Sequence, residues 1–328
     1  MELKRVLVVG GAGYVGAQLV KSMVNEGIPT RVLDTFWFGD NLLKEIWPLE
    51  IVKGDVRDLN TIREALRGID CVIHLACISN DPSFDLNPGL GKSVNLDSFL
   101  PFLKECHKFG VRRFIYASSS SVYGIKQEPL VTEDLTLEPL TDYSKYKAEC
   151  EEILLNENLN QMVRCVVRPA TICGYSPRQR FDLVVNILTA SALTQGAITV
   201  MGGSQYRPNL HIDDMVDSYI SLLNADEKKI DSQIFNVGGD NLTLSEIANR
   251  VREVVDHDLP IQVKETNDLR SYRIESSKIR NAIGFKPKRR VGDAIEDILK
   301  AFAAKKFGDD LFGSDYINIK KMQDLQLG

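Results

Sequence analysis

Short apolar runs alternate with amphipathic stretches through the first half of the chain. The runs are rich in β-branched residues, as in Val6–Val9 and Cys71–Leu75, and they predict buried strands. Between them, apolar residues recur every three or four positions, which predicts helices. Strands without a polar face that alternate with helices are typical of a parallel sheet covered on both sides. We therefore expect a doubly wound α/β fold.

The pattern changes after Pro169, where helices dominate and one further strand, Ile234–Val237, is expected to return to the first sheet. The polar tail from Phe307 receives no assignment. The strands predicted in the first half are Arg5–Val9, Thr30–Leu33, Glu50–Val52, Cys71–Leu75, Arg113–Ala117 and Val163–Val167. The helices predicted along the chain are Val15–Val24, Leu59–Leu66, Leu96–Phe109, Tyr143–Leu155, Asp182–Leu193, Asp213–Leu223, Leu244–Val255, Ser277–Ile283 and Gly292–Phe302.

Composition narrows the class of protein. The 328 residues favour about two domains, and 45 acidic against 40 basic residues argue against a nucleic-acid binder. No stretch approaches the roughly 20 apolar residues that span a bilayer.

The six cysteines are scattered without a Cys-x-x-Cys pair, which favours reduced thiols in a cytoplasmic protein. The four histidines lack metal-ligand spacing, so we expect no metal site.

A glycine-rich turn follows the first predicted strand and opens the first helix. Gly10, Gly13 and Gly16 are three residues apart, in the frame Gly-x-x-Gly-x-x-Gly. In this context the glycines permit a tight turn, backbone approach to a pyrophosphate and close packing of helix on strand. The free N–H groups at the helix start attract the anion. This turn makes the expected fold a Rossmann-type sheet that binds a dinucleotide.

Asp34 ends the second predicted strand, 18 residues after Gly16. A carboxylate there can accept hydrogen bonds from the adenosine ribose and would repel a 2′-phosphate. No basic residue follows in Thr35–Trp37, so the expected cofactor is NAD and not NADP. Asp55 follows the third strand, where contact with the adenine and a plain turn remain alternatives.

Tyr143 and Lys147 lie four residues apart on a predicted helix, so their side chains share one face. A nearby ammonium lowers the pKa of a tyrosine, which makes Tyr143 a candidate acid and base for a substrate hydroxyl. Ser119 lies in a serine run at the end of the fifth strand, where active sites of parallel sheets form. The alternatives without a catalytic role are that Tyr143 and Lys147 lie on a solvent-exposed helix face and that Ser119 lies in a polar loop.

Together these motifs resemble the extended short-chain dehydrogenases/reductases of the nucleotide-sugar epimerase/dehydratase family. The resemblance runs in order through nearly the whole chain. It is carried by Gly10–Gly16, Asp34, Gly54–Asp58, His74–Ala76, Val94–Asn95, Ser118–Gly124, Tyr143–Lys147, Arg168–Pro169, Arg207–Asp214, Tyr272 and Ser277–Lys278.

The resemblance implies a role for each matching residue. Tyr143 is the catalytic base, Ser119 assists it, and Lys147 also binds the nicotinamide ribose. Arg207 contacts the diphosphate of the substrate. The residues implied to contact NAD are Gly10, Gly13, Tyr14, Val15, Asp34, Asp55, Val56, Leu75, Ala76, Asn95, Tyr143, Lys147, Pro169 and Ile172.

One departure from the family bears on the reaction. In the family's 4,6-dehydratases, an Asp-Glu pair follows the catalytic Ser or Thr, whereas this chain has Ser120 and Ser121. Hydroxyl groups are poor acids and bases for removing water, so dehydration is disfavoured and these serines become substrate contacts. Four further residues are candidates for contact with the diphosphate, and the alternative for each is a solvated residue on the surface. They are Arg178, Arg180, Asn186 and Arg270.

We therefore expect NAD-dependent epimerisation of a nucleotide-diphosphate sugar at C4 through a transient 4-keto intermediate. The alternatives are C4 oxidation or keto reduction, C2 epimerisation, dehydration, and a non-catalytic NAD-binding regulator. Residues 1–170, with a returning segment at about 209–238, should bind the cofactor. Residues 171–208 and 239–328 should form a smaller, mostly α substrate-binding lobe.

The resemblance also implies a homodimer through a four-helix bundle made by Leu96–Phe109 and Tyr143–Leu155. An apolar stripe in the first of these helices suits either this interface or the core. The stripe consists of Phe99, Phe102, Leu103 and Cys106.

Overall fold

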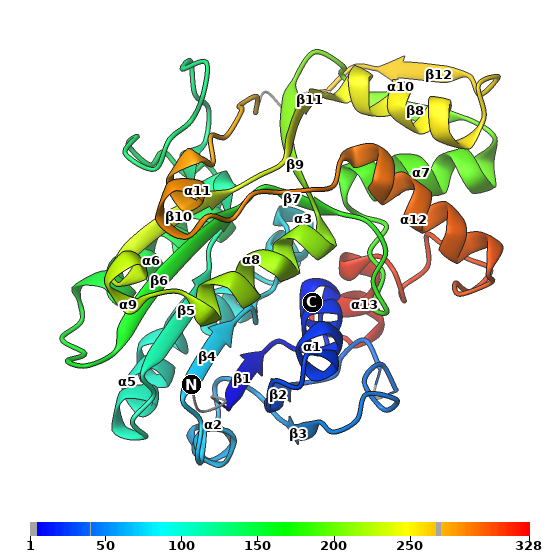
Figure 1. The fold of residues 1–328 in the computed structure, drawn as a ribbon. Coiled ribbons are helices and arrows are strands. Elements are labelled where there is room, and N and C mark those ends of the chain that lie inside the picture. The colour runs from blue at the N-terminus through cyan, green and yellow to red at the C-terminus, as the bar shows by residue number, and fades with distance from the viewer. Residues whose placement is uncertain (1–4, 40, 267–269) are drawn as a thin grey trace.

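The computed structural model describes residues 5–39, 41–266 and 270–328. Its main feature is a parallel sheet of seven strands in the order β10-β6-β5-β4-β1-β2-β3 (Figure 1). The sheet confirms the predicted Rossmann-type fold, and the strand predicted at 234–237 does return to it. Its strands are β1 Val6–Val9, β2 Thr30–Asp34, β3 Glu50–Lys53, β4 Cys71–His74, β5 Arg113–Ala117, β6 Val163–Pro169 and β10 Gln233–Val237.

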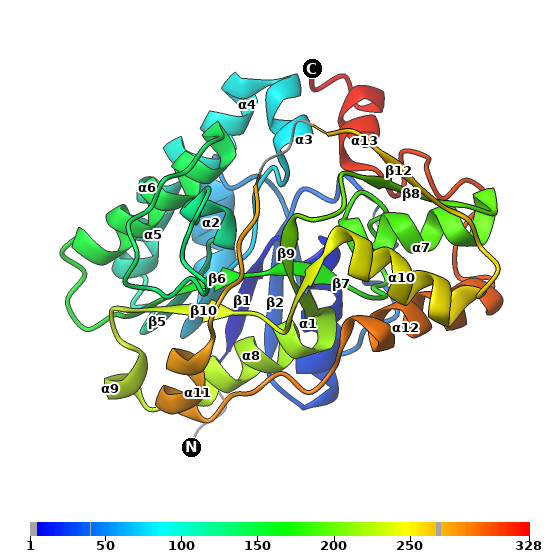
Figure 2. The ribbon, with the colours of Figure 1, turned by 90° about the horizontal axis from the view of Figure 1, so that it is seen from above.

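Helices cover both faces of the sheet (Figure 2). Alternate residues of a strand point to opposite faces, so Val6 and Val8 of β1 pack in one core while Leu7 and Val9 pack in the other. The first core includes helices α1 Tyr14–Asn25, α8 Ile212–Asn224 and α11 Ser277–Ile283. The second includes α2 Leu59–Leu66, α5 Phe99–Lys108 and α6 Asp142–Asn156.

A smaller lobe follows β6. A three-stranded sheet in the order β11-β9-β7 leads out of the large sheet, and β8 pairs with β12 further out. Three helices pack together in this lobe around their own apolar core (Figure 1). The elements are β7 Thr171–Cys173, β8 Ile198–Met201, β9 Tyr206–His211, β11 Asp240–Thr243, β12 Ile261–Lys264, α7 Val184–Gln195, α10 Leu244–Val255 and α12 Val291–Ala303.

The structure adds elements that the sequence pattern did not predict. The helix expected over 96–109 is a π-helical turn, Ser93–Asp97, followed by α5. The unassigned tail contains α13 Asn318–Asp324, which packs against α3 Asp81–Leu86 (Figure 2). Two further short helices are α4 Pro88–Lys92 and α9 Glu227–Ile230, and a 3₁₀ turn spans Ser120–Tyr123.

The apolar stripe of α5 lies in the core. Phe99 and Phe102 are buried and contact the rings of His74 and Phe114. Core packing therefore accounts for the stripe, which no longer supports a subunit interface. Among the described helices, none is long and apolar enough to cross a membrane.

Candidate active site

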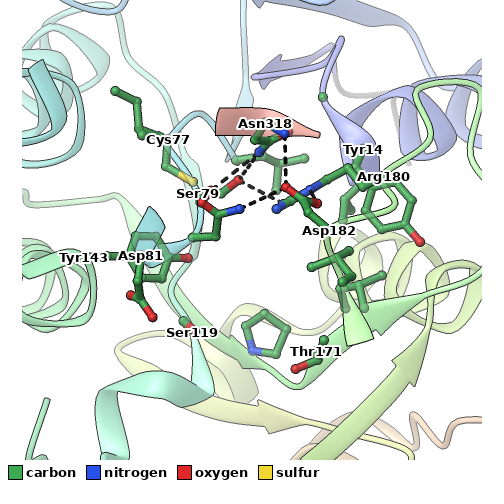
Figure 3. A pocket seen from close by; sticks show the side chains of 18 of the residues that line it. Tyr14, Cys77, Ser79, Asp81, Ser119, Tyr143, Thr171, Arg180, Asp182 and Asn318 are labelled. Carbon is green, nitrogen blue, oxygen red and sulfur yellow. Dashed lines mark hydrogen bonds and ion pairs between the residues drawn. The ribbon is translucent and has the colours of Figure 1, made fainter. Parts of the chain in front are cut away.

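A cavity of about 980 Å³ lies at the carboxyl ends of the parallel strands (Figure 3). Its wall starts at the glycine turn after β1 and continues through residues that follow β2, β3, β4, β5 and β6. The smaller lobe supplies the opposite wall. The expected site residues that line the cavity are Gly10, Gly13, Tyr14, Val15, Asp34, Asp55, Val56, Leu75, Ala76, Ser119, Ser120, Ser121, Tyr143, Pro169, Ile172, Arg207 and Arg270.

The glycine turn has the geometry that a pyrophosphate needs. Gly10 adopts φ +84°, and a Cβ there would lie 2.7 Å from the backbone nitrogen of Ala76. A Cβ on Gly16 would collide with the carbonyl of Gly10, so the helix packs as closely as predicted. Helix α1 begins at Tyr14 and directs its first N–H groups toward this turn. The chain therefore fits the phosphates of a dinucleotide.

Asp34 supports the turn and also faces the cavity. Its carboxylate accepts hydrogen bonds from the backbone N–H groups of Ala12 (2.9 Å) and Phe36 (2.8 Å). Burial raises the pKa of Asp34, while these two hydrogen bonds oppose the shift. Asp55 is held by Arg57 through contacts of 2.9 and 2.7 Å, which lower the pKa of Asp55. Both carboxylates thus have partners within the protein while they line the cavity.

Tyr143, Lys147 and Ser119 come together where α6 meets the end of β5. Tyr143 points into the cavity near Ser119 (Figure 3), and the Ser119 side chain lowers the pKa of Tyr143. The ammonium of Lys147 donates to the carbonyl of Ala117 (2.6 Å) and lies 5.9 Å from the centre of the Tyr143 ring. Lys147 is buried and does not line the cavity.

The electrostatics of Tyr143 differ from the sequence-based expectation. Burial raises the pKa of Tyr143, with smaller contributions from Cys77 and Asp81. The positive charge that opposes this shift comes from Arg180, together with the hydrogen bond to Ser119, whereas Lys147 is not among the main influences on the pKa. The effect of Lys147 on the pKa of Tyr143 stays a prediction, and the ammonium donates to the carbonyl at the end of β5.

The other serines of the run have separate partners. Ser121 bonds Ser119 through both its hydroxyl (2.8 Å) and its backbone N–H (3.1 Å). Ser120 lies 3.2 Å from the hydroxyl of Tyr272, which also lines the cavity. The run therefore forms an ordered polar wall of the cavity.

Two expected contact residues use their amides within the protein instead. Asn95 donates to and accepts from the backbone of Ile78. Asn186 is fully buried, accepts from Gly174 N–H (3.1 Å) and donates to the Tyr14 hydroxyl (3.0 Å). Neither residue lines the cavity, so each holds a loop that does.

The arginines expected at the substrate end line the cavity. Arg270 forms an ion pair of 2.8 Å with Asp81, the first residue of α3. Arg207 donates to the carbonyls of Tyr206 (3.1 Å) and Arg270. Arg178 and Arg180 are buried, so the alternative of solvated surface arginines is wrong for both.

A buried network behind the site was not predicted. Glu151, one turn beyond Lys147 on α6, forms an ion pair with Arg168 of β6 (2.6 Å) and accepts from Ser118. Arg168 also donates to the hydroxyl of Tyr123 (2.8 Å). The network fixes α6 against the serine run. The sequence gave one indication of this network: Tyr143, Lys147 and Glu151 are spaced four residues apart, which places them on one face of the helix.

Sequence reasoning also missed residues of the cavity wall around Arg180. Ser79, Asp182 and Asn318 are linked to one another and to Arg180 by hydrogen bonds (Figure 3). The sequence pattern placed Asp182 only at the start of a predicted helix and gave it no role in the site. Asn318 lies in the tail, where the polar composition gave no signal.

One group of potential metal ligands lies outside the cavity. His211, Asp213 and Asp297 approach one another, with 3.3 Å between His211 Nε2 and Asp297 Oδ2. Arg289 lies 3.7 Å from Asp213, and Lys300 lies 3.9 Å from Asp297. These cations already partner the two carboxylates.

Comparison with known proteins identifies the family. A family model described as NAD dependent epimerase/dehydratase family matches residues 6–238, which include the glycine turn, Ser119, Tyr143 and Lys147. The chain belongs to this family. The family's cofactor is NAD, in agreement with the prediction from Asp34.

Individual members of the epimerase/dehydratase family resemble this chain along most of its length. UDP-glucose 4-epimerase of Lactobacillus helveticus is 27% identical over 320 residues, covering 90% of this chain and 94% of the relative. UDP-glucuronic acid decarboxylase 6 of Arabidopsis thaliana is 29% identical over 311 residues, covering 89% and 86%. The structure of Bacillus cereus UDP-glucuronic acid 4-epimerase with UDP-glucuronic acid and NAD has a TM-score of 0.82. That chain is 23% identical, and the match covers 92% of this chain and 99% of the other.

Proposed function

We propose that this protein catalyses the NAD-dependent epimerisation of a nucleotide-diphosphate sugar at C4 through a transient 4-keto sugar. The observation that carries the proposal is that Tyr143 and Ser119 line one cavity, which begins at the glycine turn. The 4-epimerase relative, aligned along 90% of the chain, supports the choice of reaction.

Tyr143 removes the proton from the C4 hydroxyl, and Ser119 holds that hydroxyl beside it. Bound NAD would supply the acceptor and donor of the C4 hydride, and its oxidised form would supply positive charge that favours the phenolate. Arg180 and the Ser119 hydrogen bond favour the phenolate of Tyr143. When the hydride returns to the opposite face of C4, Tyr143 gives its proton back to the new hydroxyl.

The sugar must turn over between the two hydride transfers while the rest of the substrate stays in place. Arg207 and Arg270 line the cavity, and their guanidinium groups can hold a diphosphate at two oxygens. Ser120, Ser121 and Tyr272 offer hydroxyls to the sugar. Asn186 acts indirectly, because its amide fixes Tyr14 and Gly174.

The cofactor contacts follow the order of the strands. Asp34 would accept hydrogen bonds from the adenosine ribose, and Asp55 and Val56 would contact the adenine. The backbone from Gly10 to Val15 would contact the phosphates. Leu75 and Ala76 would line the cofactor cleft, Pro169 and Ile172 would flank the nicotinamide, and Asn95 holds Ile78 in the loop after β4. On this assignment, residues 1–170 and 209–238 form the cofactor domain. Residues 171–208 and 239–328 form the substrate lobe.

Decarboxylation of a UDP-uronic acid is a second candidate, because the Arabidopsis relative with that activity in its name aligns over 89% of this chain. C4 oxidation, keto reduction and C2 epimerisation would use the same tyrosine. Dehydration is disfavoured, since Ser120 and Ser121 replace the Asp-Glu pair. A regulator without activity would not need Tyr143 and Ser119 joined inside the cavity.

The protein is further assigned to the cytoplasm as a homodimer. None of the six cysteines forms a disulfide, and five of them are buried, which supports a reducing compartment. The family resemblance supports a dimer formed by α5 and α6, which lie side by side. Light scattering of the purified protein tests the dimer.

Incubation with UDP-, GDP-, CDP- and dTDP-sugars, followed by NMR of the products, tests the proposed reaction. We expect one sugar to be converted to its C4 epimer without net formation of NADH. Accumulation of a keto sugar, a pentose or a dehydrated product would replace epimerisation by the corresponding alternative.

A further inference from the structure

Two buried arginines line the cavity with few partners. Arg178 is 3% exposed and Arg180 is 8% exposed. In the described part of the chain, Arg178 donates only to Asn318, and its Nε has no partner. Arg180 donates to Asp182 (2.8 Å) and Ser79 (2.9 Å), and its Nη2 has no partner. A guanidinium has five N–H donors, and burying them unpaired is costly unless a ligand completes the set.

Asp182 and Asp34 offset part of the positive charge of this pair, and both raise the pKa of Arg178. Asp182 forms an ion pair with Arg180, but among the described residues no carboxylate oxygen lies within 4.0 Å of the Arg178 guanidinium. Burial and the neighbouring charge of Arg180 lower the pKa of Arg178. An anion between the two arginines would remove this repulsion.

The topology of the sheet places both arginines opposite the glycine turn. The Arg178 guanidinium lies 3.5 Å from the ring centre of Phe38, which follows β2, and Arg180 reaches Ser79, which follows β4. Strand β1 lies between β2 and β4, and the glycine turn follows β1. The Tyr14 hydroxyl, at the start of α1, donates to Gly174 (2.7 Å) and ties the arginine loop to this helix.

We propose that Arg178 and Arg180 bind the pyrophosphate of NAD from the side opposite the glycine turn. The turn supplies backbone N–H groups and the helix dipole, and the arginines supply forked, charged donors. Arg178 lies near Phe38 and Asp34, at the adenosine end, and this position favours the cofactor's pyrophosphate over that of the sugar nucleotide. The inference rests on the NAD assignment and holds for any of the sugar reactions.

Asn318 acts through these arginines as a positioning residue. Its side-chain oxygen accepts from Arg178, its amide donates to Ser79 (3.1 Å), and its backbone N–H donates to Asp182 (3.2 Å). Helix α13, which begins at Asn318, packs on α3 beside the loop after β4 (Figure 2). The C-terminal segment therefore holds the arginine side of the cofactor site.

Calorimetric titration with NAD, ADP-ribose and adenosine tests the assignment. For Arg178→Gln and Arg180→Gln, we expect NAD and ADP-ribose to bind about 10- to 100-fold more weakly, with adenosine unchanged. Their Kd values should also rise less steeply with salt concentration. Asn318→Ala should show the same selectivity with a smaller loss. Arg250→Gln, an exposed arginine paired with Glu253 on α10, is the matched control and should change nothing.

Equal losses for all three ligands would overturn the proposal and indicate a packing role. A loss confined to uridine diphosphate would assign the arginines to the substrate instead. Arg178→Lys and Arg180→Lys keep the charge and serve as controls for misfolding. They should reduce the affinity for NAD less than the Arg→Gln variants do. The Tm of ligand-free Arg178→Gln should not fall, because a buried unpaired charge is removed. Failure of the unmodified protein to bind NAD or ADP-ribose would overturn the NAD assignment itself, whereas loss of the sugar reaction alone would leave this site intact.

Discussion

The ammonium of Lys147 donates a hydrogen bond of 2.6 Å to the carbonyl of Ala117, the last residue of β5. This bond ties α6, which carries Tyr143, to the strand that leads into Ser119. The base and its hydrogen-bonding partner are therefore set by the contact between one helix and one strand. This contact therefore positions both Tyr143 and Ser119 in the cavity.

Tyr143→Phe should reduce kcat by about 10²- to 10⁴-fold, because the group that exchanges the C4 proton is lost. The ring remains, so NAD affinity should stay within a factor of about two. Steady-state kinetics and NAD titration of the same preparation measure both. A variant with unimpaired kcat would remove Tyr143 from the reaction.

The pH profile should report the raised pKa of Tyr143. Because burial raises this pKa, the phenolate forms only as the pH increases, and kcat/KM should climb through the alkaline range. Ser119→Ala removes the hydroxyl that lowers the pKa of Tyr143. The rise of kcat/KM with pH should therefore move to higher pH in this variant. A profile that falls with pH, or an unmoved limb in the variant, would contradict this account of the base.

Asp34→Ala should weaken NAD binding and relax discrimination against NADP. The carboxylate would otherwise repel a 2′-phosphate. The same substitution removes the hydrogen bonds to Ala12 and Phe36, so a loss common to both cofactors is expected as well. The ratio of the two Kd values separates these effects, and an unchanged ratio would show that Asp34 only supports the turn.

Breaking the buried pair behind the site should destabilise the fold. Arg168→Met leaves Glu151 charged and buried, which should lower the free energy of unfolding by about 3–5 kcal/mol. Arg168→Met combined with Glu151→Leu should recover most of that loss. Denaturant unfolding measures all three proteins. A double variant no more stable than Arg168→Met would show that the charges themselves stabilise the fold.

The sequence predicted elements well where periodicity and capping agreed. Leu59–Leu66 and Leu244–Val255 have the predicted bounds, and each is preceded by a capping residue, Asp58 or Thr243. Strands β7, β9 and β11 escaped prediction because they are short or polar and pair mainly with segments distant in the chain. Pairing of this kind leaves little local signal.

The motifs predicted which residues gather at the cavity, but not how each side chain is used. Lys147 and Asn186 both occur in the expected region, yet tertiary contacts turn their polar groups toward Ala117 and Gly174. Periodicity likewise could not assign Phe99 to the core or to an interface, because both bury an apolar stripe. The burial of Arg178 depended on the C-terminal segment, whose sequence gave no such indication.

The central claim is that hydride leaves C4 of the sugar and returns to the same carbon. Incubation of a UDP-hexose carrying deuterium at C4, with NMR of the product, tests it directly. We predict that the C4 epimer forms with the deuterium retained at C4 and with no label taken from solvent. Loss of the deuterium to solvent, or a product with unchanged configuration at C4, would contradict the account.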